Sequence, residues 1–129
     1  MRRVLRMHEA SIAMAAIDQA IAAAREHHAT RITRIELEVG VLREIVLDAM
    51  AMAFEACSIG TIAEGARLEL REEPARVRCR RCGSEFAPDI EAHSFACGSC
   101  GAADAEMLAG NEILLRSIEC ETDDEGENP

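Results

Sequence analysis

The sequence predicts an α+β fold, in which a small three-stranded sheet and two helices carry an inserted four-cysteine module. Apolar residues recur at helical spacing in two segments and alternate with charged residues in three others. Two Cys-x-x-Cys pairs lie between the second and the third alternating segment. Because predicted strands flank the cysteines on both sides, we expect the module to be an insertion between two strands of one domain.

The first helix is expected over residues 9–28 and the first strand over residues 32–41. The helix is indicated by an apolar stripe of Ile12, Ala13, Ala16, Ile17, Ala20, Ile21 and Ala24. The strand is indicated by the alternation of Ile35, Leu37, Val39 and Val41 with Arg34, Glu36 and Glu38, which ends near Gly40.

A second helix is predicted over residues 45–58. Its apolar spacing runs through Leu47, Met50, Phe54 and Cys57, and Gly60 is suited to cap its C-terminus. On this stripe we interpret Cys57 as a buried core thiol. The second strand is indicated by the alternation of Ala66, Leu68 and Leu70 before Pro74, and the third covers residues 112–119 after a turn at Gly110 and Asn111.

The four cysteines of the module are Cys79, Cys82, Cys97 and Cys100, with fourteen residues between the two pairs. A two-residue gap lets one tight turn direct two thiolates at the same ion, and two such turns complete the tetrahedral shell of structural Zn(2+). A closed shell has no open position for a substrate, so the zinc is expected to support the fold. The spacing alone leaves two disulfides or four unconnected thiols as alternatives.

The predicted elements divide the chain into three parts. Residues 7–74 and 111–119 form a discontinuous α+β domain, and residues 75–110 form the zinc-binding module. Residues 120–129 are rich in Asp and Glu and are expected to be a disordered acidic tail.

Composition excludes several classes of protein. The net charge of -10, from 24 acidic against 14 basic residues, argues against a primary role in binding nucleic acid. No segment has the ~18 consecutive apolar residues of a membrane span. With four of six cysteines in metal-ligand spacing, a reducing cytoplasmic location fits better than a secreted disulfide scaffold. The sequence lacks a nucleophile-and-base pattern and a phosphate loop, so we expect no enzymatic activity.

A second candidate metal site is Met7-His8-Glu9, where the first helix begins. If translation starts at Met7, the free amine, the His8 amide and the imidazole can close fused chelate rings, and nitrogen donors in a plane favour Ni(II) or Cu(II). Glu9 can add a carboxylate oxygen. On these residues alone, an ordinary surface His-Glu pair is the competing interpretation.

Taken together, the chain resembles the HypA/HybF family of hydrogenase maturation factors, which are nickel metallochaperones. The resemblance covers residues 7–119 and rests on MHEASIA, LEVG before DAMAMAFE, GTIAEGARLEL, the two cysteine pairs and GNEILLRSIE, in this order. It implies a site for Ni(2+), the transported ion, at His8 and Glu9, and zinc at the four cysteines. It also implies delivery of nickel to the large subunit of a [NiFe] hydrogenase with a GTPase maturation factor, and in some organisms a contribution to urease.

The chain departs from the family pattern at two places. Six residues, MRRVLR, precede the Met-His-Glu motif at which family chains ordinarily begin. We expect Met7 to be the true first residue; otherwise the amine is lost from the nickel site. Some members also carry an acidic metal ligand where Val46 stands here, flanked by Glu44 and Asp48.

A zinc-ribbon protein that binds nucleic acid or docks on a polymerase is the alternative reading of the module. Its support is a group of arginines around the first cysteine pair, namely Arg76, Arg78, Arg80 and Arg81. These arginines can instead direct the module toward an acidic partner. Exposed strand edges in a small sheet also permit a homodimer.

Overall fold

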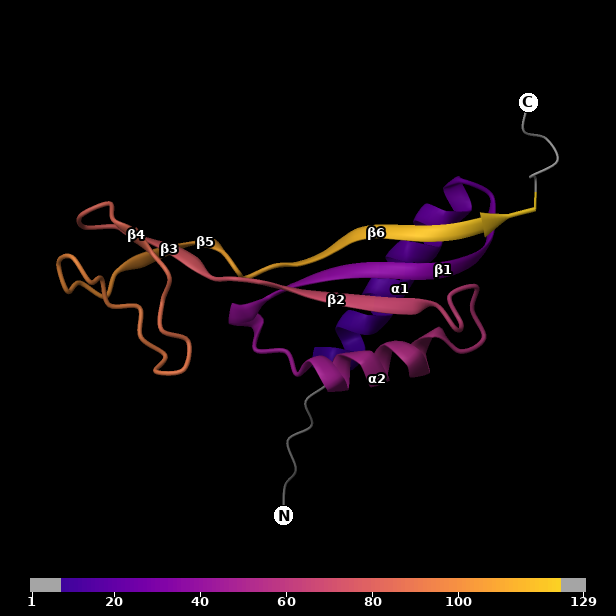
Figure 1. Cartoon of the computed structure of the whole chain (residues 1–129), viewed down its shortest axis with the longest axis horizontal. Coiled ribbons are helices and arrows are strands. Elements are labelled where there is room, and N and C mark those ends of the chain that lie inside the picture. The colour runs from indigo at the N-terminus through magenta and orange to yellow at the C-terminus, as the bar shows by residue number, and fades with distance from the viewer. Residues whose placement is uncertain (1–7, 124–129) are drawn as a thin grey trace, which may run out of the picture. The chain divides into compact units, whose positions relative to one another are not determined.

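The computed structural model describes residues 8–123 and confirms the α+β fold class, with two helices and two small sheets. In chain order the elements are α1 (His8–Glu26), β1 (Ala29–Gly40), the 3-10 turn η1 (Val41–Arg43), α2 (Leu47–Ser58), β2 (Arg67–Glu73), β3 (Arg76–Cys79), β4 (Glu85–Phe86), β5 (Ala105–Ala109) and β6 (Ile113–Thr122), as Figure 1 shows. No helix within these residues is long and apolar enough to span a bilayer.

The chain forms two compact units. The helical unit contains the residues up to Leu37, Ile45–Leu70 and the residues from Leu114 onward, and the cysteine unit contains Glu38–Glu44 and Arg71–Ile113. The cysteine unit therefore takes in more of the chain than the predicted module of residues 75–110. The end of β1 belongs to it because the Gly40 and Leu42 N–H groups donate to the carbonyls of Glu112 and Gly110, each at 2.7 Å.

The core of the helical unit lies between the sheet, in the order β2-β1-β6, and the two helices. The predicted stripe of α1 supplies Ala13, Ile17, Ala20 and Ala24, β1 supplies Ile32 and Ile35, and α2 supplies Met50 and Phe54, all of them buried. With alanines in the stripe, α1 can lie close to the strands that it crosses in Figure 1. Burial of this apolar surface is the main term that stabilises the unit.

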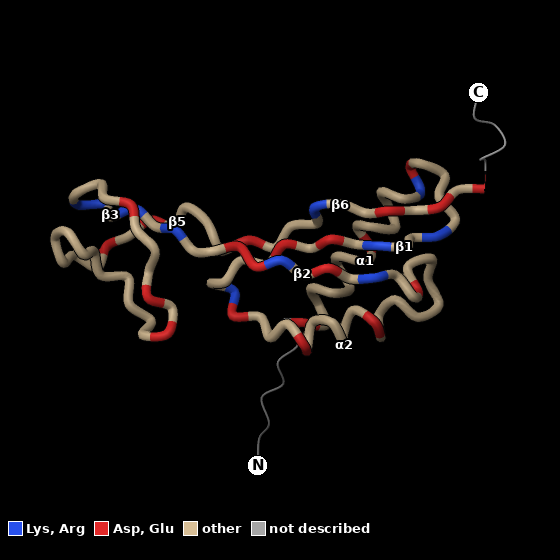
Figure 2. The backbone as a smooth tube through the Cα atoms, viewed as in Figure 1, with Lys and Arg blue, Asp and Glu red and all other residues tan. Residues whose placement is uncertain are grey.

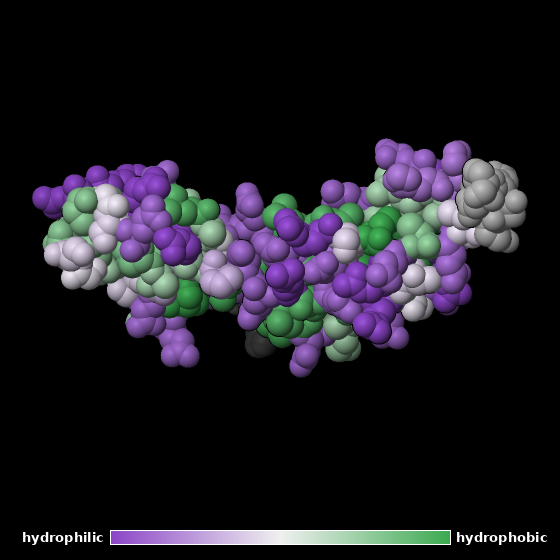
Figure 3. Space-filling model, turned by 45° about the horizontal axis from the view of Figure 1, so that its top comes forward, coloured by the Kyte–Doolittle hydropathy of each residue, from purple (hydrophilic) through white to green (hydrophobic). Residues whose placement is uncertain are grey.

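The opposite face of the sheet is polar. The Arg34 guanidinium on β1 pairs with Glu69 on β2 and lies 3.6 Å from Glu119 on β6, and Arg67 donates to Glu69 at 2.8 Å. Figure 2 shows acidic and basic positions interspersed along these strands, and hydrophilic side chains cover much of the face seen in Figure 3. The alternation recognised in the sequence therefore separates a core face from a solvent face.

Several element boundaries differ from the prediction. Helix α1 ends at Glu26, two residues early, because His28 has a positive φ of 61° that no α-helix accommodates. Helix α2 begins at Leu47 because Glu44 is left-handed and Val46 is extended. Strand β6 continues to Thr122, into the range predicted as tail, and the tail from residue 124 lies outside the described residues.

The cysteine unit contains a second sheet, ordered β4-β3-β5, that the sequence analysis did not anticipate. Strand β3 is antiparallel to both neighbours, with Val77 opposite Phe86 on one side and Met107 on the other. Val77 and Cys79 are buried while Arg76 and Arg78 are not. This alternation over four residues is the signal that could have identified the strand.

Candidate metal centres

Two cysteine loops of nearly identical backbone form the first candidate site. In each loop, the glycine after the second cysteine donates its N–H to the carbonyl of the first cysteine at 2.8 Å, from Gly83 to Cys79 and from Gly101 to Cys97. Both glycines have positive φ values, 79° and 78°, which only glycine adopts without strain. The predicted Cys-x-x-Cys turns are therefore formed by the backbone itself.

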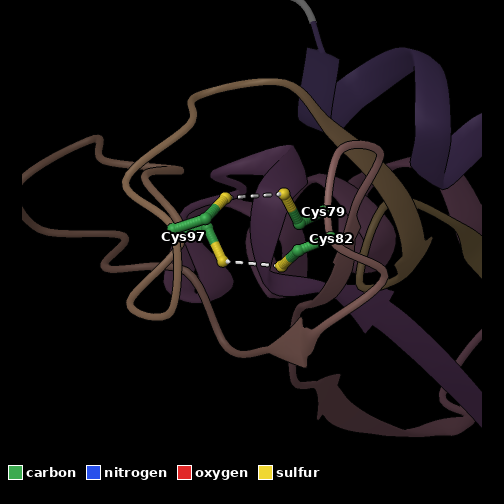
Figure 4. A group of neighbouring side chains, drawn as sticks. Cys79, Cys82 and Cys97 are labelled. Carbon is green, nitrogen blue, oxygen red and sulfur yellow. Dashed lines mark hydrogen bonds between the residues drawn. The ribbon is translucent and has the colours of Figure 1, made fainter.

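The two loops bring all four sulfurs together. The Sγ atoms of Cys79 and Cys100 are 3.6 Å apart, as are those of Cys82 and Cys97, and all four lie within 4.8 Å of one another. Figure 4 shows Cys79 and Cys82 facing Cys97 across this small space.

The sulfur spacing distinguishes between the chemical alternatives. An ion about 2.3 Å from four tetrahedral sulfurs separates them by about 3.8 Å, whereas a disulfide needs about 2.05 Å. The described cysteines are all free thiols, and the observed spacing fits the four-sulfur shell. When bound there, zinc would cross-link the two loops.

Hydrogen bonds within the cluster favour the thiolate form of its two buried members. The backbone N–H groups of Cys100 and Ser99 lower the pKa of Cys97 to about 6, and that of Cys82 lowers the pKa of Cys79. At Cys82 the Ser84 N–H also lowers the pKa. This effect is outweighed by Cys97, by burial and by the two remaining thiols, which together raise the pKa of Cys82 to about 11. A cation that neutralises shared negative charge suits this arrangement.

Three of the four arginines around the first cysteine pair have acidic partners within the unit. Arg76 and Arg78 both donate to Glu85, and Arg80 donates to Asp104 at 2.9 Å. Their charge is thereby offset locally, which argues against a phosphate-binding surface and does not favour the nucleic-acid reading of the module.

The second candidate site lies where α1 begins. His8 is the first residue of α1, but its side chain and Met7 lie outside the described part of the chain. Glu9 is 9% exposed, and its Oε2 accepts the backbone N–H of Val46 at 3.2 Å. Val46 is the N-cap residue of α2 and has no side-chain cap of its own.

The Glu9 contact ties the first turn of α1 to the start of α2. It also places the backbone of Val46 directly beside Glu9. Of the two flanking acids, Asp48 lies in the first turn of α2 and Glu44 is the left-handed residue that follows η1. Sequence reasoning missed the role of the Val46 N–H, because no pattern links residues 37 positions apart.

Cys57 and Cys120 belong to the helical unit and are not members of the cluster. Both are half-buried and pack against the core of the helical unit, so Cys57 is less buried than predicted. Their placement is that of small apolar residues.

The fold and the four-sulfur cluster define a small α+β protein with an inserted metal-binding module of the zinc-ribbon type. Residues 7–120 match the family model described as "Hydrogenase/urease nickel incorporation, metallochaperone, hypA". The chain belongs to this HypA family.

Curated relatives agree with this assignment, and a solved structure shares the fold. A protein from Dehalococcoides mccartyi named hydrogenase maturation factor HypA is 40% identical over 95% of this chain and 99% of its own length. One of the same name from Roseiflexus sp. is 41% identical over 91% of this chain and 94% of its own. In fold, the chain is similar to the solution structure of the Ni metallochaperone HypA from Helicobacter pylori, with a TM-score of 0.67, 22% identity, and 89% and 98% of the two chains covered.

Proposed function

We propose that this protein binds Ni(II) through its N-terminal segment and delivers it to the large subunit of a [NiFe] hydrogenase, with a GTPase maturation factor as partner and urease as a further target. The observation that supports this most is the family match, which covers both candidate metal sites. The protein acts as a carrier and not as an enzyme, and works in the cytoplasm.

We assign nickel to His8 and Glu9. In support, the Glu9 carboxylate is held by a backbone N–H donor, and metal-ligating carboxylates are characteristically oriented by such hydrogen bonds. A carboxylate has two oxygens, so Glu9 can accept from Val46 with one and bind the ion with the other. A site with few side-chain ligands can also release its ion by ligand exchange when a partner approaches.

We assign structural zinc to Cys79, Cys82, Cys97 and Cys100. The observation in favour is that the sulfurs already have near-tetrahedral spacing. Four thiolates leave no coordination position for the transported ion, so nickel and zinc occupy separate places.

Equilibrium nickel binding by calorimetry on the zinc-loaded protein tests the assignment. We expect His8→Ala to lose most nickel affinity, Glu9→Gln to lose part of it, and His27→Ala, a control at the other end of α1, to bind like the wild type. Chains beginning at Met1 and at Met7 should differ if the amine is a ligand. Equal nickel affinity in His8→Ala and the wild type would contradict the proposal.

The role in maturation is tested separately, in a host that lacks its own member of the family. Expression of the wild type should restore nickel-dependent hydrogenase activity, and His8→Ala should not. Failure of the wild type to restore activity, with both partner proteins present, would argue against delivery.

A further inference from the structure

The helical unit has an open hollow beside α2. One wall is formed by α2 and its C-terminal end, with Ala51, Glu55 and Ile59, and the other by the following loop and β2, with Glu64, Ala66 and Leu68. We call this hollow the α2 groove. Its volume is about 550 Å³.

The exposed side of α2 continues the groove as a ridge. Asp48, Met52, Glu55 and Ile59 follow one another at spacings of four, three and four residues, so they line up along one side of the helix. We call these four residues the α2 ridge. Met52 is 71% exposed and Ile59 is 66% exposed, and Val46, just before the helix, is 59% exposed. Exposed apolar side chains that are grouped along one helix beside a groove mark a candidate binding surface.

The charge of this surface has one sign. Asp48, Glu55 and Glu64 are acidic, and neither α2 nor the lining of the groove contains a basic residue. The neighbouring Arg67 belongs to the polar face of the sheet, where it donates to Glu69 at 2.8 Å. Arg31 lines a separate hollow that shares Glu64, so the negative charge of this surface comes mainly from Asp48 and Glu55.

This combination limits what can occupy the groove. A second copy bound through the same face would bring the acidic residues of the two ridges together, and an anionic lipid surface would be repelled in the same way. A protein segment with aliphatic side chains beside Lys or Arg complements both features, since its apolar groups fill the groove and its cations meet Asp48 and Glu55.

We propose that the α2 groove and the α2 ridge dock a cationic, apolar segment of a protein partner during nickel transfer. The docked segment would lie on α2, whose N-cap residue Val46 donates its N–H to Glu9. Docking would therefore involve the same helix that Glu9, the proposed nickel ligand, contacts at its N-terminal end. This inference rests on the proposed function.

Binding to the two expected partners, the GTPase maturation factor and the hydrogenase large subunit, tests the proposal with full-length nickel-loaded protein. Met52→Gln removes an exposed apolar group, and Met14→Gln on α1, where Met14 is 57% exposed, is its matched control. Glu55→Lys reverses a charge on the ridge, and Glu26→Lys reverses one at the end of α1.

We expect Met52→Gln to weaken binding of at least one partner by about tenfold, the loss characteristic of an interface anchor. Glu55→Lys should weaken the same complex by about tenfold in 50 mM NaCl and by much less in 500 mM, because salt screens the interaction. Met14→Gln and Glu26→Lys should bind within about twofold of the wild type, as substitutions outside an interface do. Amide NMR shifts on complex formation should concentrate in residues 48–68.

The proposal is overturned if neither partner binds the wild type, if the ridge variants bind as well as their controls, or if the shifts lie on the polar face of the sheet. It is also overturned if Met52→Gln converts a dimer into a monomer, since the groove would then hold a second copy. Nickel affinity, measured on the same samples, reports separately on the proposed function, because docking variants should leave it unchanged.

Discussion

Close backbone packing at Gly40 provides a sharp test of the structure. A Cβ at this position would lie 2.3 Å from both the carbonyl carbon and the carbonyl oxygen of Gly110, whereas ordinary van der Waals contacts of a Cβ lie at 3.4–4 Å. Gly40→Ala must therefore separate two backbone segments by about 1 Å. Because both neighbours are backbone and not flexible side chains, we expect Gly40→Ala to lower the free energy of unfolding by about 3 kcal/mol, the upper end for overpacking. The midpoint of thermal unfolding should fall by about 10 °C.

Other glycines separate the effect of contact from that of dihedral angle. Gly40 has an ordinary φ of -68°, so its substitution tests contact alone. Gly60 has a φ of +83° and open space around it, so Gly60→Ala should cost about 1 kcal/mol. Gly110 combines a φ of +94° with Ala75 Cα at 2.6 Å from its Cβ position and should cost the most. Gly98→Ala, with open space around it, is the neutral control.

Denaturant unfolding of the zinc-loaded variants, followed by far-ultraviolet circular dichroism, measures these differences. The ordering should be Gly110, Gly40, Gly60 and Gly98, from most to least destabilised. If Gly40→Ala unfolds within about 0.5 kcal/mol of Gly98→Ala, the range expected of a neutral surface change, the close approach of these segments is wrong.

Three further predictions concern the sites and the polar face. Val46→Pro removes the backbone N–H that donates to Glu9, and proline accepts the φ of -80° at Val46, so this variant should weaken nickel binding in calorimetry. Leu47→Pro, at the first position of α2, should leave nickel binding unchanged. Hydrogen bonds from Arg34 and Arg67 lower the pKa of Glu69 to about 2. The stability that these bonds contribute is present above pH 4.5 and is lost as the pH falls toward 2. In acid-unfolding curves, Arg34→Met should therefore be less stable than the wild type near pH 6, and this difference should shrink below pH 4.5. Removing zinc with a chelator should unfold the cysteine unit while the helical circular dichroism persists, and retention of the amide NMR dispersion of residues 76–109 would contradict a supporting role for the metal.

Patterns of local origin predicted much of the fold. The stripe of α1 was correct because helical spacing places Ala13, Ile17, Ala20 and Ala24 on one side regardless of what they contact. The cysteine cluster was predicted for a similar reason, since two-residue spacing brings sulfurs together within a single turn. Both features depend on chemistry within a few residues.

What the sequence did not predict depends on distant contacts or unusual backbone. His28, Glu44 and His93 adopt positive φ values of 53–61° although none is glycine, and two of them mark the ends of predicted helices. The Val46 N–H finds its acceptor on another helix, and β3 pairs with β5 across the whole metal-binding loop. Propensity carries no information about such partners.

The four sulfurs differ in how a competitor can reach them. Cys79 and Cys97 are only 1% and 3% exposed, while Cys82 and Cys100, one from each loop, face solvent. A chelator would therefore reach an ion held by these residues from the side of Cys82 and Cys100. The residues that would hold zinc thus comprise one buried and one solvent-facing sulfur from each loop, so each loop would contribute equally to the shielded and to the accessible side of the ion.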